Sequence, residues 1–320
     1  MPPPATRAAT ARPPASDSNA EQGGNVKLQD LRPGWRSDFI LHRRGALVTA
    51  RDDCLVVRTP ANPNFYWGNF LLLPQAPQDD ELAHWMDRFD EEITRVQPAS
   101  QHVALGINGA LAGGSLPTWV AAGFEVMPTA VLELRLGELR VPRRAARGDV
   151  QVRPLDLATE LEAAVALQCA DPQDFEPVNN ELHRRAQMQR YAEMAEAGEA
   201  LWFGVWCDGV LAADCGLMRE ATAPGAGLVA DRVGLGRFQH VSTHPLWRRR
   251  GLCSTLVHAV SRHAFEQWGL ARMLMCADPD DVAIGIYESL GFVRIDSEWC
   301  LQLRAPHDRA HERIANFEKA

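Results

Sequence analysis

Residues 248–254 have the composition of a phosphate-binding helix start. They read Arg-Arg-Arg-Gly-Leu-Cys-Ser, between a strand-like run that Pro245 ends and a long amphipathic run. The first N–H groups of a helix have no partner inside the helix, and the helix dipole adds partial positive charge there. Such a site suits a diphosphate. We expect Gly251 to keep a Cβ away from the approaching phosphates. The predicted contacts are Arg248, Arg249, Arg250, Gly251, Leu252, Cys253 and Ser254.

A second informative segment spans residues 277–292. It reads ADPDDVAIGIYESLGF, which predicts a short helix that ends before Gly291. Tyr287 lies on this helix. The sequence therefore places an anion site and a tyrosine on two helices that one strand-like run, ARMLMCADP, connects.

These two segments resemble the GNAT superfamily of N-acetyltransferases. The first follows the family pattern [Q/R]-x-x-G-x-[G/A] except at its last position, where Cys253 replaces a glycine or alanine. The second matches the pattern A-x-x-[L/I]-Y-x-x-x-G-F at Ala283, Ile286, Tyr287, Gly291 and Phe292. The resemblance covers roughly residues 150–305 and includes the order of the two motifs.

The resemblance implies that acetyl-CoA is the co-substrate and that an amine attacks its thioester directly. The pantetheine arm would bind the backbone near Val241 and Thr243, where two strands splay apart, and a backbone N–H would polarise the acetyl carbonyl. Tyr287 stands at the position of the family's general acid. Asp280 stands where the family often has an asparagine, and we include it among the cofactor contacts.

The general base and the acceptor are less defined. Alternation along residues 237–243 puts Arg237, Gln239, Val241 and Thr243 on one strand face, and by analogy Gln239 looks into the active site. His240, a water-relayed base and an amine that arrives neutral all remain open. The loop at 170–180 carries Asp171, Asp174 and Glu176, and its acids would suit a cationic amine. We predict substrate contacts from Asp174, Glu176 and Gln239. The acceptor is an amine of a small molecule or of a protein, and the acyl preference stays open.

The elements around these motifs predict a mixed α/β (α+β) fold. From residue 149 onward, strand-like and helical runs alternate, and Asp208-Gly209 forms a hairpin turn. The first half shows the same outline: two strand-like runs between 38 and 60, a strand ended by Pro74, a helix at 80–94 and TWVAAGF (118–124), which resembles IYESLGF (286–292). This predicts tandem GNAT-like domains, each a mostly antiparallel central sheet flanked by helices, with splayed strands at the cofactor slot.

We expect five segments along the chain. They are a disordered tail at 1–30, a GNAT-like domain at 33–140, a linker at 141–149, the catalytic domain at 150–305 and a C-terminal tail at 306–320. The first domain is expected to be degenerate: acidic residues Asp79, Asp80 and Glu81 follow Pro74 in place of arginines, and Trp119 replaces the phenol. A GNAT fold that binds acyl-CoA as a sensor without turnover is the alternative to an enzyme.

Composition limits the partners and the location that we expect for the protein. The net charge of −8 and the isoelectric point near 5.7 disfavour a nucleic-acid partner. No apolar run is long enough to cross a membrane. Seven scattered cysteines without a CxxC pair indicate a reducing compartment, hence a cytoplasmic protein, and no metal site. Packing of the two halves within one chain would favour a monomer, with a homodimer as the alternative.

Overall fold

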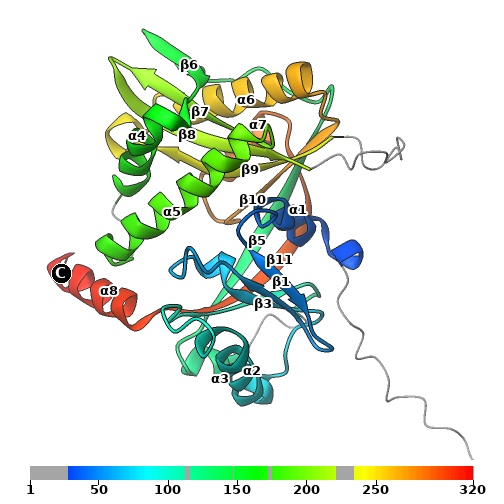
Figure 1. The fold of residues 1–320 in the computed structure, drawn as a ribbon. Helices are drawn as coiled ribbons and strands as arrows, with labels where there is room; N and C mark the ends of the chain where they lie inside the picture. The colour runs from blue at the N-terminus through cyan, green and yellow to red at the C-terminus, as the bar shows by residue number, and fades with distance from the viewer. Residues whose placement is uncertain (1–27, 112–115, 147, 172–174, 221–233, 320) are drawn as a thin grey trace, which may run out of the picture.

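The computed structural model describes residues 28–111, 116–146, 148–171, 175–220 and 234–319, with side chains described up to residue 312. Within these ranges the chain forms one twisted sheet with helices on both faces (Figure 1). None of the described helices is long and apolar enough to cross a membrane.

Eleven strands make up the described sheet. The first half contributes β1 (Leu47–Ala50), β2 (Leu55–Arg58), β3 (Phe70–Leu73), β4 (Val103–Ile107) and β5 (Glu125–Arg135). The second half contributes β6 (Val150–Pro154), β7 (Ala200–Cys207), β8 (Val210–Arg219), β9 (Leu235–Thr243), β10 (Arg272–Ala277) and β11 (Val293–Leu303). Their spatial order is β1-β2-β3-β4-β11-β5-β10-β9-β8-β7-β6.

The α-helices are α1 (Pro33–Leu41), α2 (Leu82–Phe89), α3 (Pro117–Ala121), α4 (Leu157–Cys169), α5 (Pro177–Glu196), α6 (Leu252–Trp268), α7 (Ala283–Ser289) and α8 (Pro306–Lys319). Short 3-10 turns are η1 (Leu28–Asp30), η2 (Tyr66–Gly68), η3 (Asp79–Glu81) and η5 (Pro245–Trp247), and η4 (Asp90–Thr94) is a π-helical turn after α2. The Asp208-Gly209 turn between β7 and β8 is confirmed, with both residues at positive φ.

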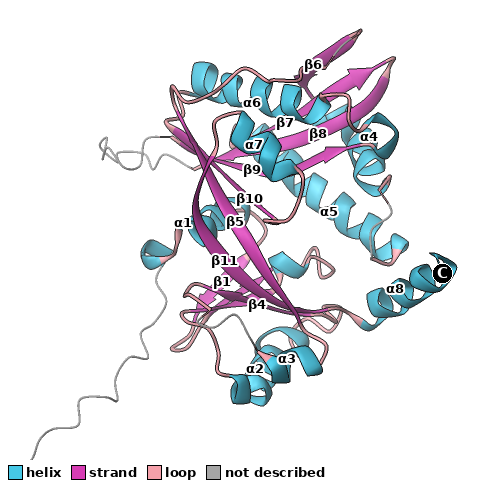
Figure 2. Ribbon diagram, turned by 180° about the vertical axis from the view of Figure 1, so that it is seen from behind, coloured by secondary structure: helices cyan, strands magenta, loops and turns pink. Residues whose placement is uncertain are grey.

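The two halves exchange their last strands. β5 of the first half pairs with β10 of the second, and β11 of the second half pairs with β4 of the first. β5 and β11 also pair with each other along the middle of the sheet, where Figure 2 shows them as two long crossing strands. Neither half therefore completes its sheet with its own residues alone.

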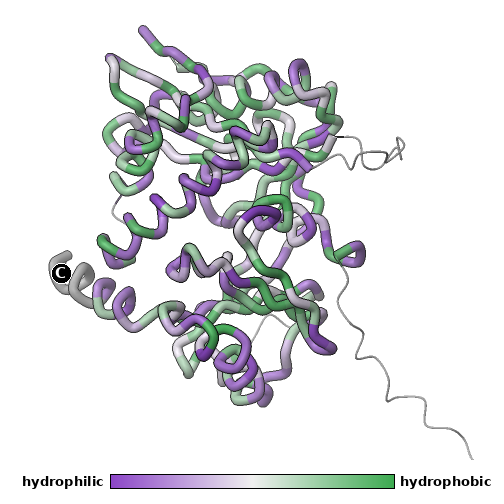
Figure 3. Tube along the Cα trace, in the orientation of Figure 1, coloured by the Kyte–Doolittle hydropathy of each residue, from purple (hydrophilic) through white to green (hydrophobic). Residues whose placement is uncertain are grey.

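The expected repeat is visible in the topology. β3 and β4 are parallel neighbours with α2 between them in sequence, as β9 and β10 are with α6 between them. A short helix follows in each half, α3 and α7, and then the exchanged strand. Hydrophobic residues concentrate along the strands in Figure 3, and the buried clusters lie between the sheet and its helices.

Two expectations for the ends of the halves differ from the structure. Residues 38–41, the start of a run expected as strand, belong to α1. The first turn of α1 is completed by a distant residue: Glu298 on β11 accepts a hydrogen bond of 2.6 Å from the Trp35 N–H. Residues 306–319, expected as a tail, form α8. The tail expected at 1–30 lies outside the described residues up to residue 27, and η1 covers its end.

Candidate active site

β9 and β10 diverge, as the sequence predicts. They pair in parallel only from Leu235–Arg237 with Arg272–Leu274, although β9 continues to Thr243 and β10 to Ala277. A β-bulge in β9 lies just beyond this point, between the pairs Gln239↔Gly216 and Ser242↔Asp214. The extra residue lets His240 adopt a φ of +49°.

The bulge corrects the expected side-chain alternation. Arg237 lies on the face toward α1, where its guanidinium bonds Asp38 at 2.6 Å. Beyond the bulge, Val241 packs against the apolar cluster under α6. A single extra residue reverses the facing of all later side chains. The prediction that 237, 239, 241 and 243 share one face is therefore wrong.

A large cavity of about 920 Å³ opens between the diverging strand β9 and helices α6 and α7. Of the predicted cofactor contacts it is lined by Val241, Thr243, Arg248, Arg249, Gly251, Leu252, Cys253 and Ser254, together with Tyr287. Arg250 and Asp280 are not among the lining residues. Arg250 instead covers the Trp247 ring at 4.5 Å, and Asp281 takes the lining position next to Asp280.

Gly251 is the N-cap of α6 and has a φ of +80°. A Cβ at this position would lie 2.7 Å from the carbonyl oxygen of Arg144, closer than real contacts permit. A glycine is therefore needed at this position for two reasons besides phosphate binding. The backbone is left-handed, and a side chain would collide with the segment at Arg144. Arg248 bonds Asp171 and the Thr243 carbonyl, so its guanidinium is held beside the cavity.

The neighbouring segment is the expected linker, which packs over the start of α6. Ser254 Oγ donates to the Arg144 carbonyl at 2.7 Å, and Thr255 Oγ accepts from the Ala146 N–H at 2.8 Å. Arg143 and Arg144 consequently line the large cavity beside the helix start. Sequence reasoning missed these two arginines, although VPRRAARGD showed them as a basic pair.

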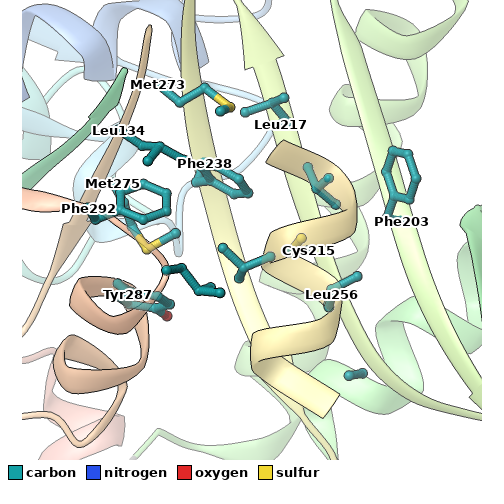
Figure 4. Packing of buried hydrophobic residues seen from close by; sticks show 14 of the residues in the cluster. Leu134, Phe203, Cys215, Leu217, Phe238, Leu256, Met273, Met275, Tyr287 and Phe292 are labelled. Carbon is teal, nitrogen blue, oxygen red and sulfur yellow. The ribbon is translucent and has the colours of Figure 1, made fainter. Parts of the chain in front are cut away.

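Tyr287 lies deep in the wall of the large cavity, 5% exposed and packed near Phe292 (Figure 4). Burial raises the pKa of its phenol, so the hydroxyl stays protonated at neutral pH. Cys253 is close by, and burial raises the pKa of its thiol to about 12. A protonated thiol is a poor nucleophile, which argues against a covalent intermediate on this cysteine.

A buried carboxylate supports the far wall of the cavity. Asp214 accepts hydrogen bonds from Ser242 Oγ at 2.6 Å, Trp202 Nε1 at 2.8 Å and Gln168 Nε2 at 3.0 Å. Burial raises the pKa of Asp214 to about 6. Two of its three donors, Ser242 and Gln168, line the cavity, so this group fixes β9 and α4 there.

His240 accepts a hydrogen bond through Nδ1 in this arrangement. The Arg184 guanidinium, which can only donate, lies 3.2 Å from Nδ1 of His240. Burial, then Arg184 and His183, hold the pKa of His240 well below its usual value. The neutral ring must therefore carry its proton on Nε2, and this atom has no hydrogen-bond partner among the described residues. Because its one acceptor nitrogen is occupied, His240 does not fit the role of general base.

A small cavity of about 190 Å³ lies on the other side of the bulge. Gln239 and Arg184 line it from the second half, and the aromatic segment Phe65-Tyr66-Trp67 lines it from the first. Arg184 thus contacts the small cavity and, through His240, the wall of the large one. Both halves of the chain build this space, and Figure 1 shows α5 facing the first half.

Of the two acidic residues predicted to contact the acceptor, the structure describes only Glu176. Glu176 caps α5: its carboxylate accepts from the backbone of Val178 and Asn179, and it does not line the small cavity. Asp174 lies outside the described residues. The acid that does line the cavity is Asp308 at the start of α8, which sequence reasoning assigned to a tail.

The corresponding place in the first half carries acidic side chains. A cavity of about 650 Å³ follows Pro74 and is lined by Asp79. The Asp79 carboxylate accepts from the Thr118 N–H and hydroxyl at the start of α3. Trp119, in the place of Tyr287, is fully buried. These features disfavour a phosphate at this end of the molecule.

Comparison with known proteins agrees with this geometry. The model of the acetyltransferase (GNAT) family matches residues 166–292. No curated protein gives a significant match to the sequence.

Three solved structures show the same overall fold at low identity. A functionally unknown conserved protein from Staphylococcus epidermidis has a TM-score of 0.65 at 13% identity, over 82% of this chain and 95% of that one. A GCN5-related N-acetyltransferase from Kribbella flavida has a TM-score of 0.55 at 17% identity, over 85% and 95%. A tandem GNAT protein from the clavulanic acid biosynthesis pathway has a TM-score of 0.50 at 14% identity, over 81% and 83%.

The likeness to the tandem protein extends over both halves, and the family match falls on the half that contains the arginine-rich helix start and Tyr287. The chain therefore contains a domain of the acetyltransferase (GNAT) family within a tandem GNAT fold.

Proposed function

We propose that the chain transfers an acetyl group from acetyl-CoA to a primary amine. One observation carries this proposal: the divergence of β9 and β10, the start of α6 and Tyr287 all border the same large cavity. Residues 150–305 would act as the catalytic domain, and residues 33–140 as a degenerate GNAT-like domain joined to it by 141–149.

Acetyl-CoA would lie along the large cavity. The unpaired N–H groups of Leu252, Cys253 and Ser254 would hold the diphosphate. Arg249, Arg143 and Arg144 would add positive charge. The pantetheine arm would lie along Val241 and Thr243, where β9 has no strand partner on its β10 side and its backbone groups are free to bond.

The transfer is a direct displacement. The amine nitrogen attacks the thioester carbonyl carbon, an amide bond forms, and the carbon–sulfur bond breaks. The thiolate takes the phenolic proton of Tyr287, and the proton lost from nitrogen passes to water, from which the tyrosinate is reprotonated. The backbone N–H groups of the bulge would donate to the carbonyl oxygen, where negative charge develops.

The acceptor would enter through the small cavity, because Gln239 lines it and the adjacent His240 lines the large one. Since His240 is not available as a base, the amine must arrive neutral or lose its proton through water.

The seven free cysteines favour a cytoplasmic location. The exchange of β5 and β11 within one chain supports a monomer, and sedimentation of a stable dimer would count against that.

Calorimetric titration with acetyl-CoA tests the proposal. Gly285 lines the large cavity and has open space where a Cβ would lie. Gly285→Trp should fill the cavity and abolish binding, whereas the matched control Gly285→Ala should bind as the wild type does. Thiol release with a panel of primary amines then tests turnover. Binding without thiol release would indicate a sensor, and no binding by the wild type would overturn the proposal.

A further inference from the structure

Helix α5 turns polar side chains toward the interior. Figure 3 colours much of this helix as hydrophilic although it packs against the sheet. Gln187 is 2% exposed and Arg190 is 7% exposed. Nε2 of Gln187 has no hydrogen-bond partner among the described residues, and the Arg190 guanidinium contacts the rings of Phe65 and Tyr191 without a carboxylate partner there. Burying unpaired donors, above all a charged guanidinium, costs free energy unless an acceptor is supplied.

These donors are beside the small cavity. Gln187 lines it directly. Arg190 lies one turn further along α5, with its guanidinium carbon 5.5 Å from the ring centre of Phe65, which also lines the cavity. Arg184, one turn before Gln187, lines it as well. The wall therefore presents the side chains of Gln187 and Arg184, and Arg190, which is not itself a lining residue, adds positive charge beside it.

Among the described residues, the acidic side chains near Gln187 and Arg190 already have hydrogen-bond partners. Asp38 is bonded to Arg237, and Asp214 is occupied by its three donors. Asp308 is the one acidic side chain among the described lining residues, and it contacts the Glu176 N–H at the start of α5. Gln187 is eleven residues further along the helix, about 16 Å away. The cavity is thus acidic at one end and rich in donors at the other.

We propose that the acceptor amine carries a carboxylate, which binds at Gln187 and Arg190. This inference rests on the proposed function, because it takes the small cavity as the acceptor site. A planar carboxylate matches the fork of a guanidinium, and a volume of about 190 Å³ suits a small molecule. Phe65, Trp67 and Phe175 provide apolar walls. The acceptor class is therefore a small amino acid with an apolar or aromatic side chain.

The same charges would prepare the amine for attack. A cation near an ammonium group disfavours its charged form and lowers its pKa. Arg184, bonded to His240 at the boundary of the two cavities, places such a cation close to the reacting nitrogen. The carboxylate of the acceptor would thus be held by the wall that also favours its neutral amine, which removes the need for a dedicated base.

Binding of simple carboxylates tests this inference without any transfer reaction. Calorimetry would compare monocarboxylates from butyrate to 3-phenylpropionate with amines from butylamine to phenethylamine, using wild type, Arg190→Met and Arg185→Met. Arg185 is on the same helix but bonds Glu162 and Glu181 at the surface, so it controls for the loss of one charge. We expect carboxylates to bind the wild type and the control equally, and Arg190→Met roughly tenfold or more weakly.

Acetyl-CoA affinity, expected to be unchanged, verifies that each variant is folded. If Arg190→Met does not fold, Gln187→Met provides the same comparison. Equal carboxylate binding by wild type and a folded variant would overturn the inference, as would tighter binding of phenethylamine or inorganic phosphate than of 3-phenylpropionate. Carboxylate binding without acetylation of phenylalanine or any other amine would refute the proposed function while leaving the carboxylate site in place.

Discussion

Ser254 in the first turn of α6 donates its hydroxyl to the backbone carbonyl of Arg144, at 2.7 Å. A residue of the cofactor motif is therefore joined to the linker between the two halves. The proposed diphosphate site is consequently made of α6 and of a segment that the motif does not include.

Ser254→Ala should weaken acetyl-CoA binding roughly fivefold, since a neutral hydrogen bond contributes about 1 kcal/mol. The reason is loss of the contact that holds Arg143 and Arg144 beside the cavity. Ser261→Ala removes a buried hydroxyl from the same helix, outside the cavity, and should leave affinity unchanged. Equal calorimetric affinity in all three proteins would contradict the role of the linker.

Gly251→Ala should destabilise the protein more than Gly269→Ala does. Both glycines flank α6 at positive φ, but a Cβ at 269 meets nothing within 4 Å, whereas one at 251 meets the linker. Backbone strain alone costs about 1–2 kcal/mol, so Gly269→Ala measures that component. Urea unfolding gives both values. Equal losses of unfolding free energy in the two variants would show that the linker moves away from a Cβ at position 251 without cost.

Tyr287→Phe should lower kcat roughly a hundredfold or more, in the range expected for loss of general acid catalysis. Acetyl-CoA affinity should change little, because the ring remains packed near Phe292. Thiol-release kinetics and calorimetry on one preparation separate the two effects. Undiminished turnover would remove the phenol from the mechanism.

Asp214→Asn should change how stability depends on pH. The pKa of Asp214 is about 6 in the folded protein, above its usual value of 3.8, because the side chain is buried. Protonation therefore favours the folded state, and this contribution, about 3 kcal/mol at most, is present below pH 4 and lost as the pH rises to 6. We expect wild type to lose this stability between pH 4 and 7 relative to Asp214→Asn.

Urea unfolding at pH 4, 5.5 and 7 measures the difference, because buried histidines contribute equally to both proteins. Asp208→Asn, in the exposed turn of the same hairpin, should show the pH dependence of the wild type. A constant difference between wild type and Asp214→Asn across this range would mean that Asp214 does not titrate there.

The sequence predicted the parts of the fold that depend on local patterns. The helix after Gly251, the helix that carries Tyr287 and the hairpin at Asp208-Gly209 follow from capping, periodicity and turn chemistry, and all are present. The exchange of β5 and β11 was not predictable in this way, because either partner would satisfy the apolar pattern of a buried strand.

Local signals were also insufficient at the active site. The bulge at His240 has no sequence signature, and it reversed the expected facing of Val241 and Thr243. The small cavity is assembled from α5, η2 and α8, which are far apart in sequence, so neither Gln187 nor Asp308 could be associated with Phe65 in advance. The helical start at Trp35 depends on Glu298, a contact across most of the chain.

The exchange of strands has a consequence for synthesis of the protein. β4 lies next to β11 in the sheet, and β11 is translated only after β5 to β10. While the ribosome is still adding residues 150–292, one edge of β4 and one edge of β5 therefore remain unpaired, because both pair with β11. The first half can complete its sheet only after residue 303 has left the exit tunnel, so a nascent chain stalled before that point would expose these edges to other chains.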